Sequence, residues 1–149
     1  MLKKAAVDRH VAEIEDLLRN VGTMLKKHGR DILSNFDITP PQLEAMLVLR
    51  EFGELTMGEL CHKMFLACST ATDLIDRMER NLLIERVRDT ADRRVIRLKV
   101  LPKGASVIDE VLEARRAYLA IILAEIDVVD KERLIQSLEQ LNDLMTRGV

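Results

Sequence analysis

The side chains best suited to chemistry in this sequence are hydroxyl and guanidinium groups in the middle of the chain. A segment with helical periodicity carries Ser69, Thr70 and Thr72 on its polar face. Further along, Arg93 and Arg94 stand side by side in a polar stretch. Hydroxyl and guanidinium groups form hydrogen bonds with phosphate oxygens and with the base edges of duplex DNA. These residue types therefore predict binding to a nucleic acid rather than a covalent reaction.

The positive charge of the chain is concentrated in one short segment. The 149 residues carry a formal net charge of −2, whereas nucleic-acid-binding modules are often strongly basic. Residues 84–104 nevertheless carry seven basic and three acidic residues, a local net charge of +4. Residues 41–83 and 105–149 carry −3 and −4. The overall charge argues mildly against nucleic-acid binding, and the local charge favours it.

No arrangement typical of an enzyme or a metal site is found in the sequence. His10, His28 and His62 are scattered, without a partner at the spacing of metal ligands or of a general base. There is no Gly-rich phosphate loop and no nucleophile paired with a base. Cys61 and Cys68 are too few for a disulfide framework and lack the spacing of a zinc site. We therefore expect no catalytic residues, no metal and no cofactor.

The position of Cys68 leaves a redox function open. This residue stands at the predicted start of a helix, where the positive end of the helix dipole lowers the pKa of a thiol. A thiol with a low pKa is a target for oxidants, so a redox-responsive regulator that uses Cys68 is one alternative function. A small, partly buried packing residue is the simpler interpretation.

Length and composition fit one domain with a hydrophobic core. The chain is 48% hydrophobic, which is too apolar for a disordered protein. No stretch approaches the roughly 18 uninterrupted apolar residues of a membrane span, and residues 1–4 are not followed by an apolar signal segment. We expect a cytoplasmic protein without membrane contact.

Two helices are predicted in the first third of the chain. Apolar residues recur at spacings of three, four and seven from Val7 to Leu33, which predicts a helix of roughly 25 residues, about 38 Å long. Such a helix is too long to fold back within a small globule, so we expect it to need a partner helix. Thr39 suits the N-cap and Pro40 the first position of a second helix, which ends at Gly53.

A helix-turn-helix is predicted next. Thr56 and Glu59 match a capping box that opens a short helix to about Lys63. A turn over residues 64–67 separates it from a helix over residues 68–82, and two short helices joined by a tight turn form a helix-turn-helix. The polar face of the second helix comprises Ser69, Thr70, Thr72, Asp73, Asp76, Arg77 and Arg80.

The periodicity then changes to that of strands. A polar turn over residues 89–94 separates two segments with apolar and β-branched residues, which predicts a two-stranded hairpin with a charged tip. Pro102 and Gly104 end the hairpin, and a long helix with an apolar stripe follows. Asp130 is expected to cap a last helix.

The order of these elements predicts a winged helix-turn-helix fold that is mainly α with a small β-hairpin. Residues 38–102 would form the DNA-binding core of a single domain, and the long helices of residues 1–37 and 103–149 would mediate dimerisation. A recognition helix fits the major groove, and arginines at a hairpin tip reach the narrower minor groove, where the potential is negative. A dimer would present two recognition helices about one DNA turn apart.

Seven segments of the chain follow a pattern shared with one family of transcription factors: residues 43–49, 55–60, 69–72, 74–79, 83–86, 89–94 and 103–104. The most specific part is the run Asp92, Arg93, Arg94 after a strand with a hydrophobic-Glu-Arg pattern. On these residues the chain resembles the MarR (multiple antibiotic resistance regulator) family. The long flanking helices extend the resemblance to nearly the whole chain through their pattern.

The resemblance implies a homodimer that binds a palindromic operator in double-stranded DNA, usually as a repressor that a small-molecule effector releases. Effectors of this family lodge between the dimerisation helices and the winged core, and no motif here marks the effector-binding residues. For Arg94 the resemblance implies both DNA contact and an ion pair with Asp76, and Asp92 is expected to orient Arg94. The expected DNA-binding residues are Ser69, Thr70, Thr72, Asp73, Arg77, Asp92, Arg93 and Arg94.

Three residues depart from the family pattern. Asp73 stands where a basic residue is common; it could accept a hydrogen bond from a cytosine amino group, be neutralised by Arg77, or point away from DNA. Leu82 replaces a glycine, and Asn81 is expected to supply the left-handed turn instead. Leu101 lacks the side-chain oxygen of a capping threonine. The overall acidity and Asp73 keep a second function open, a winged-helix protein-interaction module without DNA binding.

Overall fold

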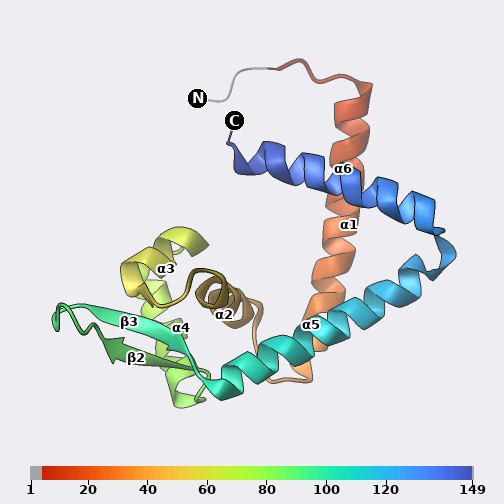
Figure 1. Ribbon diagram of the computed structural model, residues 1–149. Coiled ribbons are helices and arrows are strands. Elements are labelled where there is room, and N and C mark those ends of the chain that lie inside the picture. Colours follow the sequence, from red (N-terminus) through yellow and green to blue (C-terminus); the bar gives the residue numbers. More distant parts are fainter. Residues whose placement is uncertain (1–4, 149) are drawn as a thin grey trace. The chain divides into compact units, whose positions relative to one another are not determined.

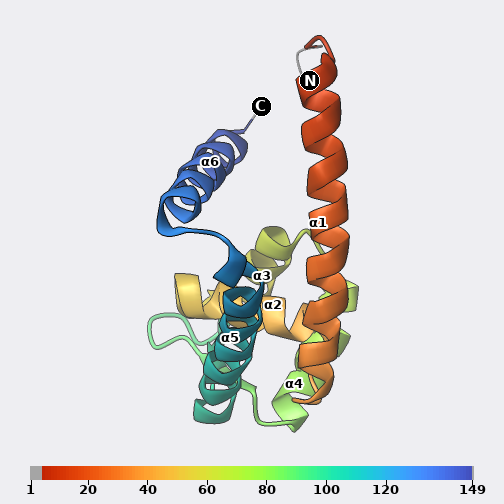
Figure 2. The same ribbon diagram turned by 90° about the vertical axis from the view of Figure 1, so that its right-hand side faces the viewer.

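The computed structural model describes residues 5–148, which form a mainly helical structure with a small antiparallel sheet (Figure 1). The winged helix-turn-helix fold class is confirmed. Figure 2 shows α1 as a single unbroken helix, and its 26 residues match the predicted length. The elements follow in the order α1 (Arg9–Ser34), α2 (Pro40–Phe52), β1 (Leu55–Thr56), α3 (Met57–Met64), α4 (Cys68–Arg80), β2 (Ile84–Arg88), β3 (Ile96–Val100), α5 (Pro102–Ile122), the 3-10 helix η1 (Leu123–Glu125) and α6 (Val128–Thr146).

The chain divides into two compact units. Residues 26–115 hold the helix-turn-helix and the sheet, and we call them the winged-helix unit. The described residues of the other unit, 5–25 and 116–148, we call the terminal-helix unit. All buried side chains of the described residues lie in the winged-helix unit. The largest fully buried ones come from helices and strands alike: Met46, Leu60, Ile75, Met78, Ile84, Leu98, Ile108 and Val111.

Reciprocal side-chain caps set where α2 and α3 begin. The Thr39 hydroxyl accepts a hydrogen bond from the backbone N–H of Gln42 (3.4 Å), and Gln42 Oε1 accepts one from the backbone N–H of Thr39 (3.1 Å). Thr56 and Glu59 form the same pair at α3, at 2.8 and 3.2 Å. The predicted N-caps Thr39 and Thr56 are therefore confirmed. Gly53, with φ of 79°, ends α2 as expected.

The cap of α6 differs from the prediction. Asp127, not Asp130, is the N-cap, and its Oδ1 accepts a hydrogen bond from the backbone N–H of Asp130 at 2.8 Å. Asp130 lies in the first turn of α6 and pairs with Arg133 at 3.1 Å. The prediction of Asp130 as the N-cap was therefore wrong. Both aspartates suit the start of a helix, so the residue types alone do not show which of them is the cap.

The sheet contains a strand that the sequence pattern did not predict. β1 pairs antiparallel with β3, so the order is β1-β3-β2 rather than a two-stranded hairpin. Leu55 lies opposite Leu98, and Thr56 lies opposite Arg97. A strand of two residues is too short to show a period-2 pattern, and Thr56 also caps α3, which is the signal that the sequence displays.

The turn from α4 to β2 is made by Leu82 and not by Asn81. Asn81 has φ of −86°, whereas Leu82 has φ of 58°, in the left-handed region. The backbone N–H of Leu83 thereby reaches the carbonyl of Met78 at 3.0 Å, as in a helix C-terminal motif of the Schellman type. Leu83 is buried while Leu82 is 63% exposed. Burial of Leu83 thus places the left-handed residue one position later than expected.

Replacing Leu82 with Gly is expected to raise the free energy of unfolding by about 0.5–1 kcal/mol. Glycine adopts positive φ without the steric cost of a Cβ atom, and the exposed Leu82 side chain contributes little burial. Chemical denaturation measures the change. Asn81→Gly is the matched control, because Asn81 has negative φ and glycine there only adds flexibility to the unfolded chain. Equal or opposite effects of the two variants would contradict this account of the turn.

Candidate nucleic-acid interface

Helix α4 presents one apolar and one polar face. Ala71, Ile75 and Met78 are buried in the core of the winged-helix unit. Their spacing of three and four residues leaves the opposite face open. All the predicted contact residues of α4 are exposed on it: Ser69, Thr70, Thr72, Asp73 and Arg77. The sequence periodicity therefore placed these five side chains correctly on the solvent side.

The hydroxyl groups at the start of α4 are not used to cap it. The N-cap residue is Ala67, and no side chain forms a cap hydrogen bond there. Thr72 Oγ1 donates to the carbonyl of Cys68 at 2.9 Å and keeps its oxygen lone pairs free. The hydroxyl groups of Ser69 and Thr70 form no hydrogen bond to another group of residues 5–148. Two hydroxyls at the exposed start of α4 are thus available to an external partner.

The tip of the hairpin holds Arg94 in a defined position. Asp92 Oδ1 accepts hydrogen bonds from both the backbone N–H and Nε of Arg94 at 3.1 Å, and Asp92 Oδ2 accepts one from Nη2 at 3.2 Å. These bonds to Arg94 hold the pKa of the Asp92 carboxyl below its ordinary value. The Arg94 side chain remains 91% exposed. The expectation that Asp92 orients Arg94 agrees with this geometry.

The expected ion pair between Asp76 and Arg94 is wrong. Asp76 Oδ1 instead lies 2.6 Å from Nη2 of Arg86, and Glu79 Oε1 lies 2.9 Å from Nη1 of the same guanidinium. Glu79 also accepts a hydrogen bond from the backbone N–H of Arg86 at 3.1 Å. Both acids raise the pKa of Arg86. Arg86 takes this place because its strand, β2, packs directly against α4, whereas Arg94 lies beyond the strands at the hairpin tip.

The Arg86 bridge joins the recognition helix to the hairpin. Two residues of α4, Asp76 and Glu79, bind one guanidinium of β2, and that side chain is about three-quarters buried. A partly buried arginine with two carboxylates is a stronger and less mobile contact than a fully exposed pair. The hairpin is therefore joined to the helix that presents the polar face. The two predicted DNA-contacting elements, α4 and the hairpin, are held in a fixed relative position.

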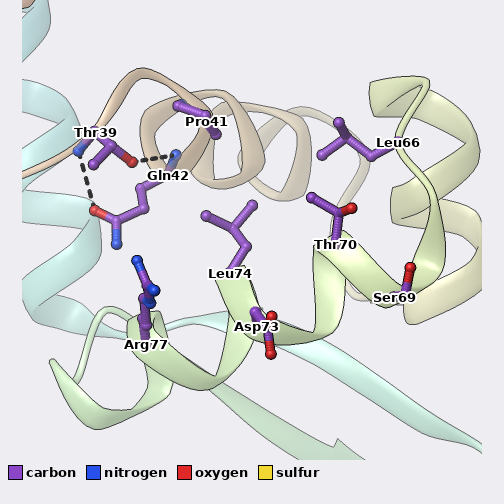
Figure 3. Close-up of a pocket in the computed structure, with 9 residues that line it drawn as sticks. All are labelled: Thr39, Pro41, Gln42, Leu66, Ser69, Thr70, Asp73, Leu74 and Arg77. Atoms are coloured by element: carbon purple, nitrogen blue, oxygen red, sulfur yellow. Dashed lines mark hydrogen bonds between the residues drawn. The ribbon is translucent and has the colours of Figure 1, made fainter.

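A hollow separates the polar side of α4 from the start of α2 (Figure 3). Its volume is about 540 Å³, and Thr39, Gln42 and Pro41 line one wall while Asp73 and Arg77 line the other. Gln42 is the one buried polar or charged side chain of the described residues. Gln42 was not among the residues predicted from the sequence to form the site, although the spacing Thr-x-x-Gln is the signal of a capping box.

Asp73 and Arg77 do not form an ion pair within the described chain. Both side chains are exposed, one helical turn apart on the same face of α4. Salt bridges elsewhere in residues 5–148 do not involve either residue. The structure therefore offers no internal neutralisation of Asp73, and its carboxylate is presented to solvent.

The two cysteines are neighbours in the helix-turn-helix. Cys68 is exposed as the first residue of α4, and Cys61 is buried in α3. Burial, followed by the nearby Cys68 thiol, raises the pKa of Cys61 to about 11. Cys61 is therefore protonated and unreactive at neutral pH.

Residues 5–148 contain neither a metal-binding cluster nor a membrane-spanning helix. No group of three or more His, Cys, Asp or Glu side chains there could hold a metal ion. No helix among these residues is long and apolar enough to cross a membrane.

Comparison with known proteins identifies the family. The family model described as MarR family matches residues 38–96. The chain is 54% identical to the HTH-type transcriptional regulator YsmB of Bacillus subtilis (strain 168) over 110 residues, which cover 74% of this chain and 75% of the relative. The chain belongs to the MarR family. A solved MarR family protein from Bacillus stearothermophilus is 48% identical, with a TM-score of 0.89, over 95% of this chain and 99% of that protein.

A more distant MarR relative carries a more specific name. The HTH-type transcriptional repressor MdtR of Bacillus subtilis (strain 168) is 28% identical over 132 residues, 89% of this chain and 83% of the relative. Together these relatives make the chain a DNA-binding, helix-turn-helix transcriptional regulator and not an enzyme. The resemblance drawn from the residues of the helix-turn-helix and the hairpin is confirmed.

Proposed function

We propose that this MarR-family regulator is a cytoplasmic homodimer that represses transcription from a palindromic operator until a small-molecule effector releases it. The observation that carries the proposal is the Arg86 bridge, because it ties the exposed polar face of α4 to the arginine-bearing hairpin. Helix α4 can then enter a major groove while the β2–β3 hairpin contacts the adjacent minor groove.

The proposed DNA contacts fall into two classes. Ser69, Thr70 and Thr72 at the start of α4 reach base edges and phosphates in the major groove. Arg93 and Arg94 at the hairpin tip reach the DNA backbone or the minor groove, and Asp92 fixes the guanidinium of Arg94 through two hydrogen bonds. Asp73 and Arg77 complete the proposed set on α4.

The proposed dimer is supported by the terminal-helix unit. None of its described side chains is buried, although its helices carry apolar residues at helical spacing. Exposed apolar stripes of this length mark a protein interface. The exposed apolar side chains are, on α1, Val11, Ile14, Leu17, Leu18, Val21, Met24 and Leu25; on α5, Leu119, Ile121 and Ile122; and on α6, Val128, Val129, Leu134, Ile135, Leu138, Leu144 and Met145.

The domain assignment belongs to the same proposal. Residues 38–102 serve as the DNA-binding core, and the helices of residues 1–37 and 103–149 serve dimerisation. Repression is supported by the name of the relative MdtR. Release by an effector rests on the family resemblance, and the effector-binding residues are not assigned.

Replacing Arg94 with Ala is expected to weaken binding to operator and random duplex alike. Each lost phosphate contact should also reduce the slope of log K against log salt by about 0.9 per subunit. Fluorescence anisotropy on labelled duplexes at several salt concentrations measures both quantities, and Arg93→Ala should behave in the same way. Arg133→Ala, which removes an exposed arginine of α6, is the control.

The outcomes of this experiment separate the alternatives. Normal binding by Arg94→Ala would exclude the hairpin from the interface. A wild-type protein that binds no duplex DNA at any salt concentration would favour the interaction module without DNA binding. A loss of binding only after peroxide treatment, abolished by Cys68→Ser, would favour the redox-responsive regulator.

A further inference from the structure

The side-chain NH2 group of Gln42 forms no hydrogen bond within the described part of the fold. The side chain is only 6% exposed, and its Oε1 accepts the capping hydrogen bond from Thr39. Its Nε2 donates a hydrogen bond to no group of residues 5–148. No buried side-chain nitrogen or oxygen of this part of the chain lacks a partner. Nε2 therefore reaches the surface, where Gln42 lines the hollows beside α4.

The unused amide faces a second donor. Figure 3 shows Gln42 Nε2 directed toward the guanidinium of Arg77 across the gap between α2 and α4. Both groups only donate hydrogen bonds, so neither can satisfy the other. Arg80 lines the adjoining hollow of about 410 Å³ together with Gln42 and Arg77. An acceptor with negative charge is the chemistry that satisfies donors converging in this way.

The hydrogen-bond donors in the gap between α2 and α4 are side chains and not backbone N–H groups at the N-terminus of α2. Pro40 and Pro41 are the first two residues of α2 and have no N–H group. The N–H groups of Gln42 and Leu43 are both bonded to Thr39. The backbone therefore has no N–H left to offer an anion there, and the amide of Gln42 takes its place.

Two carboxylates border the same position. Asp73 lines the first hollow, and Asp37 lines the second. Figure 3 shows the Asp73 carboxylate turned away from Gln42, so it does not occupy the gap. The Asp73 carboxylate therefore leaves the gap between Gln42 and Arg77 open, and Asp37 is the acidic residue beside the three donors Gln42, Arg77 and Arg80 that line the second hollow.

We propose that Gln42 Nε2 and the Arg77 guanidinium together hold one backbone phosphate of duplex DNA. The proposal rests on the proposed function. When α4 enters a major groove, the strands that border the groove pass along both sides of the helix. The gap between α2 and α4 lies on one of these sides, and a phosphodiester supplies two acceptor oxygens with one negative charge. Gln42 is then a DNA-binding residue as well as the partner of the Thr39 cap.

Gln42→Glu tests the contact without removing the cap. Glutamate at this position also accepts the hydrogen bond from the N-cap backbone, but it replaces the donor with a carboxylate that repels phosphate. We expect binding to a random-sequence duplex to weaken about tenfold while the unfolding temperature stays within a few degrees of wild type. Gln136→Glu makes the same chemical change on α6 and should leave binding unchanged.

A double-mutant cycle tests whether Gln42 and Arg77 hold the same phosphate. Arg77→Gln alone should weaken binding about tenfold and reduce the salt slope by about 0.9 per subunit. A double variant of Arg77→Gln with Gln42→Ala, which adds no charge at position 42, should then bind about as weakly as Arg77→Gln alone, because one lost phosphate cannot be lost twice. Additive effects would assign the two residues to separate contacts and overturn the shared site.

The remaining outcomes are distinct. Wild-type affinity of Gln42→Glu, with wild-type protein that binds duplex, would overturn this contact alone and leave the proposed function standing. Absence of duplex binding by the wild-type protein would overturn both. A loss of binding accompanied by a large drop in unfolding temperature, repeated in Gln42→Leu, would assign Gln42 to the cap only and overturn the contact.

Discussion

Aspartate at both Ile14 and Leu18 is expected to convert the protein from dimer to monomer at micromolar concentration. These two side chains lie one turn apart on the exposed apolar face of α1. In a single chain the new carboxylates remain in water, whereas in a dimer they would be buried without partners, which costs several kcal/mol. Sedimentation velocity measures the change, and we expect dimerisation to weaken at least a hundredfold.

The control for this change keeps the added charge and moves it to another face of α1. Asn20→Asp with Thr23→Asp adds two carboxylates on the polar side of the helix and should leave the dimer intact. The monomeric variant should also bind a palindromic duplex far more weakly than wild type, since two linked recognition helices act together. A double variant at Ile14 and Leu18 that stays dimeric would place the interface elsewhere.

Gly104→Ala is expected to lower the free energy of unfolding by about 3 kcal/mol. A Cβ atom at position 104 would lie 2.3 Å from the carbonyl oxygen of Leu83 and 3.0 Å from a methyl carbon of Val100. That carbonyl cannot move freely, because it accepts the backbone hydrogen bond of Leu101 at 2.9 Å. The backbone must shift to admit the methyl group, and overpacking of this kind costs a few kcal/mol.

Thermal unfolding followed by circular dichroism measures this loss, which corresponds to a fall of roughly 10 °C for a chain of this size. Gly58→Ala is the matched control, because nothing lies within 4 Å of a Cβ atom there. Position 58 is in α3, where alanine is the better helix former, so that variant should gain up to about 1 kcal/mol. An unchanged Gly104→Ala protein would show that α5 can move away from Leu83.

Features that depend on neighbours in the chain were predictable. Thr39 and Thr56 cap their helices because the partner residue lies only three positions away, so the pattern contains both ends of the interaction. The polar face of α4 followed from helical periodicity in the same way. The tip pair of Asp92 and Arg94, two residues apart, is likewise local.

In the terminal-helix unit the sequence predicted the helices but not how they pack. Its amphipathic pattern predicted long helices, and α1, α5 and α6 confirm them. The same pattern does not show which helix packs against which, because the apolar faces of α1, α5 and α6 carry similar aliphatic side chains. The dimer therefore stays a proposal that rests on exposed side chains, and the α1 variants are its direct test.

By itself the sequence determined the caps of α2 and α3, the amphipathic faces and the order of a winged helix-turn-helix, because each depends on residues within about one turn or strand. Tertiary structure decided which basic residue meets Asp76, and it chose Arg86 because β2 packs on α4. It also placed Leu82 in the left-handed turn, since burial of Leu83 sets the backbone. Finally, it brought Gln42 opposite Arg77 across 35 positions of sequence, because distances between packed elements have no local signature in the chain.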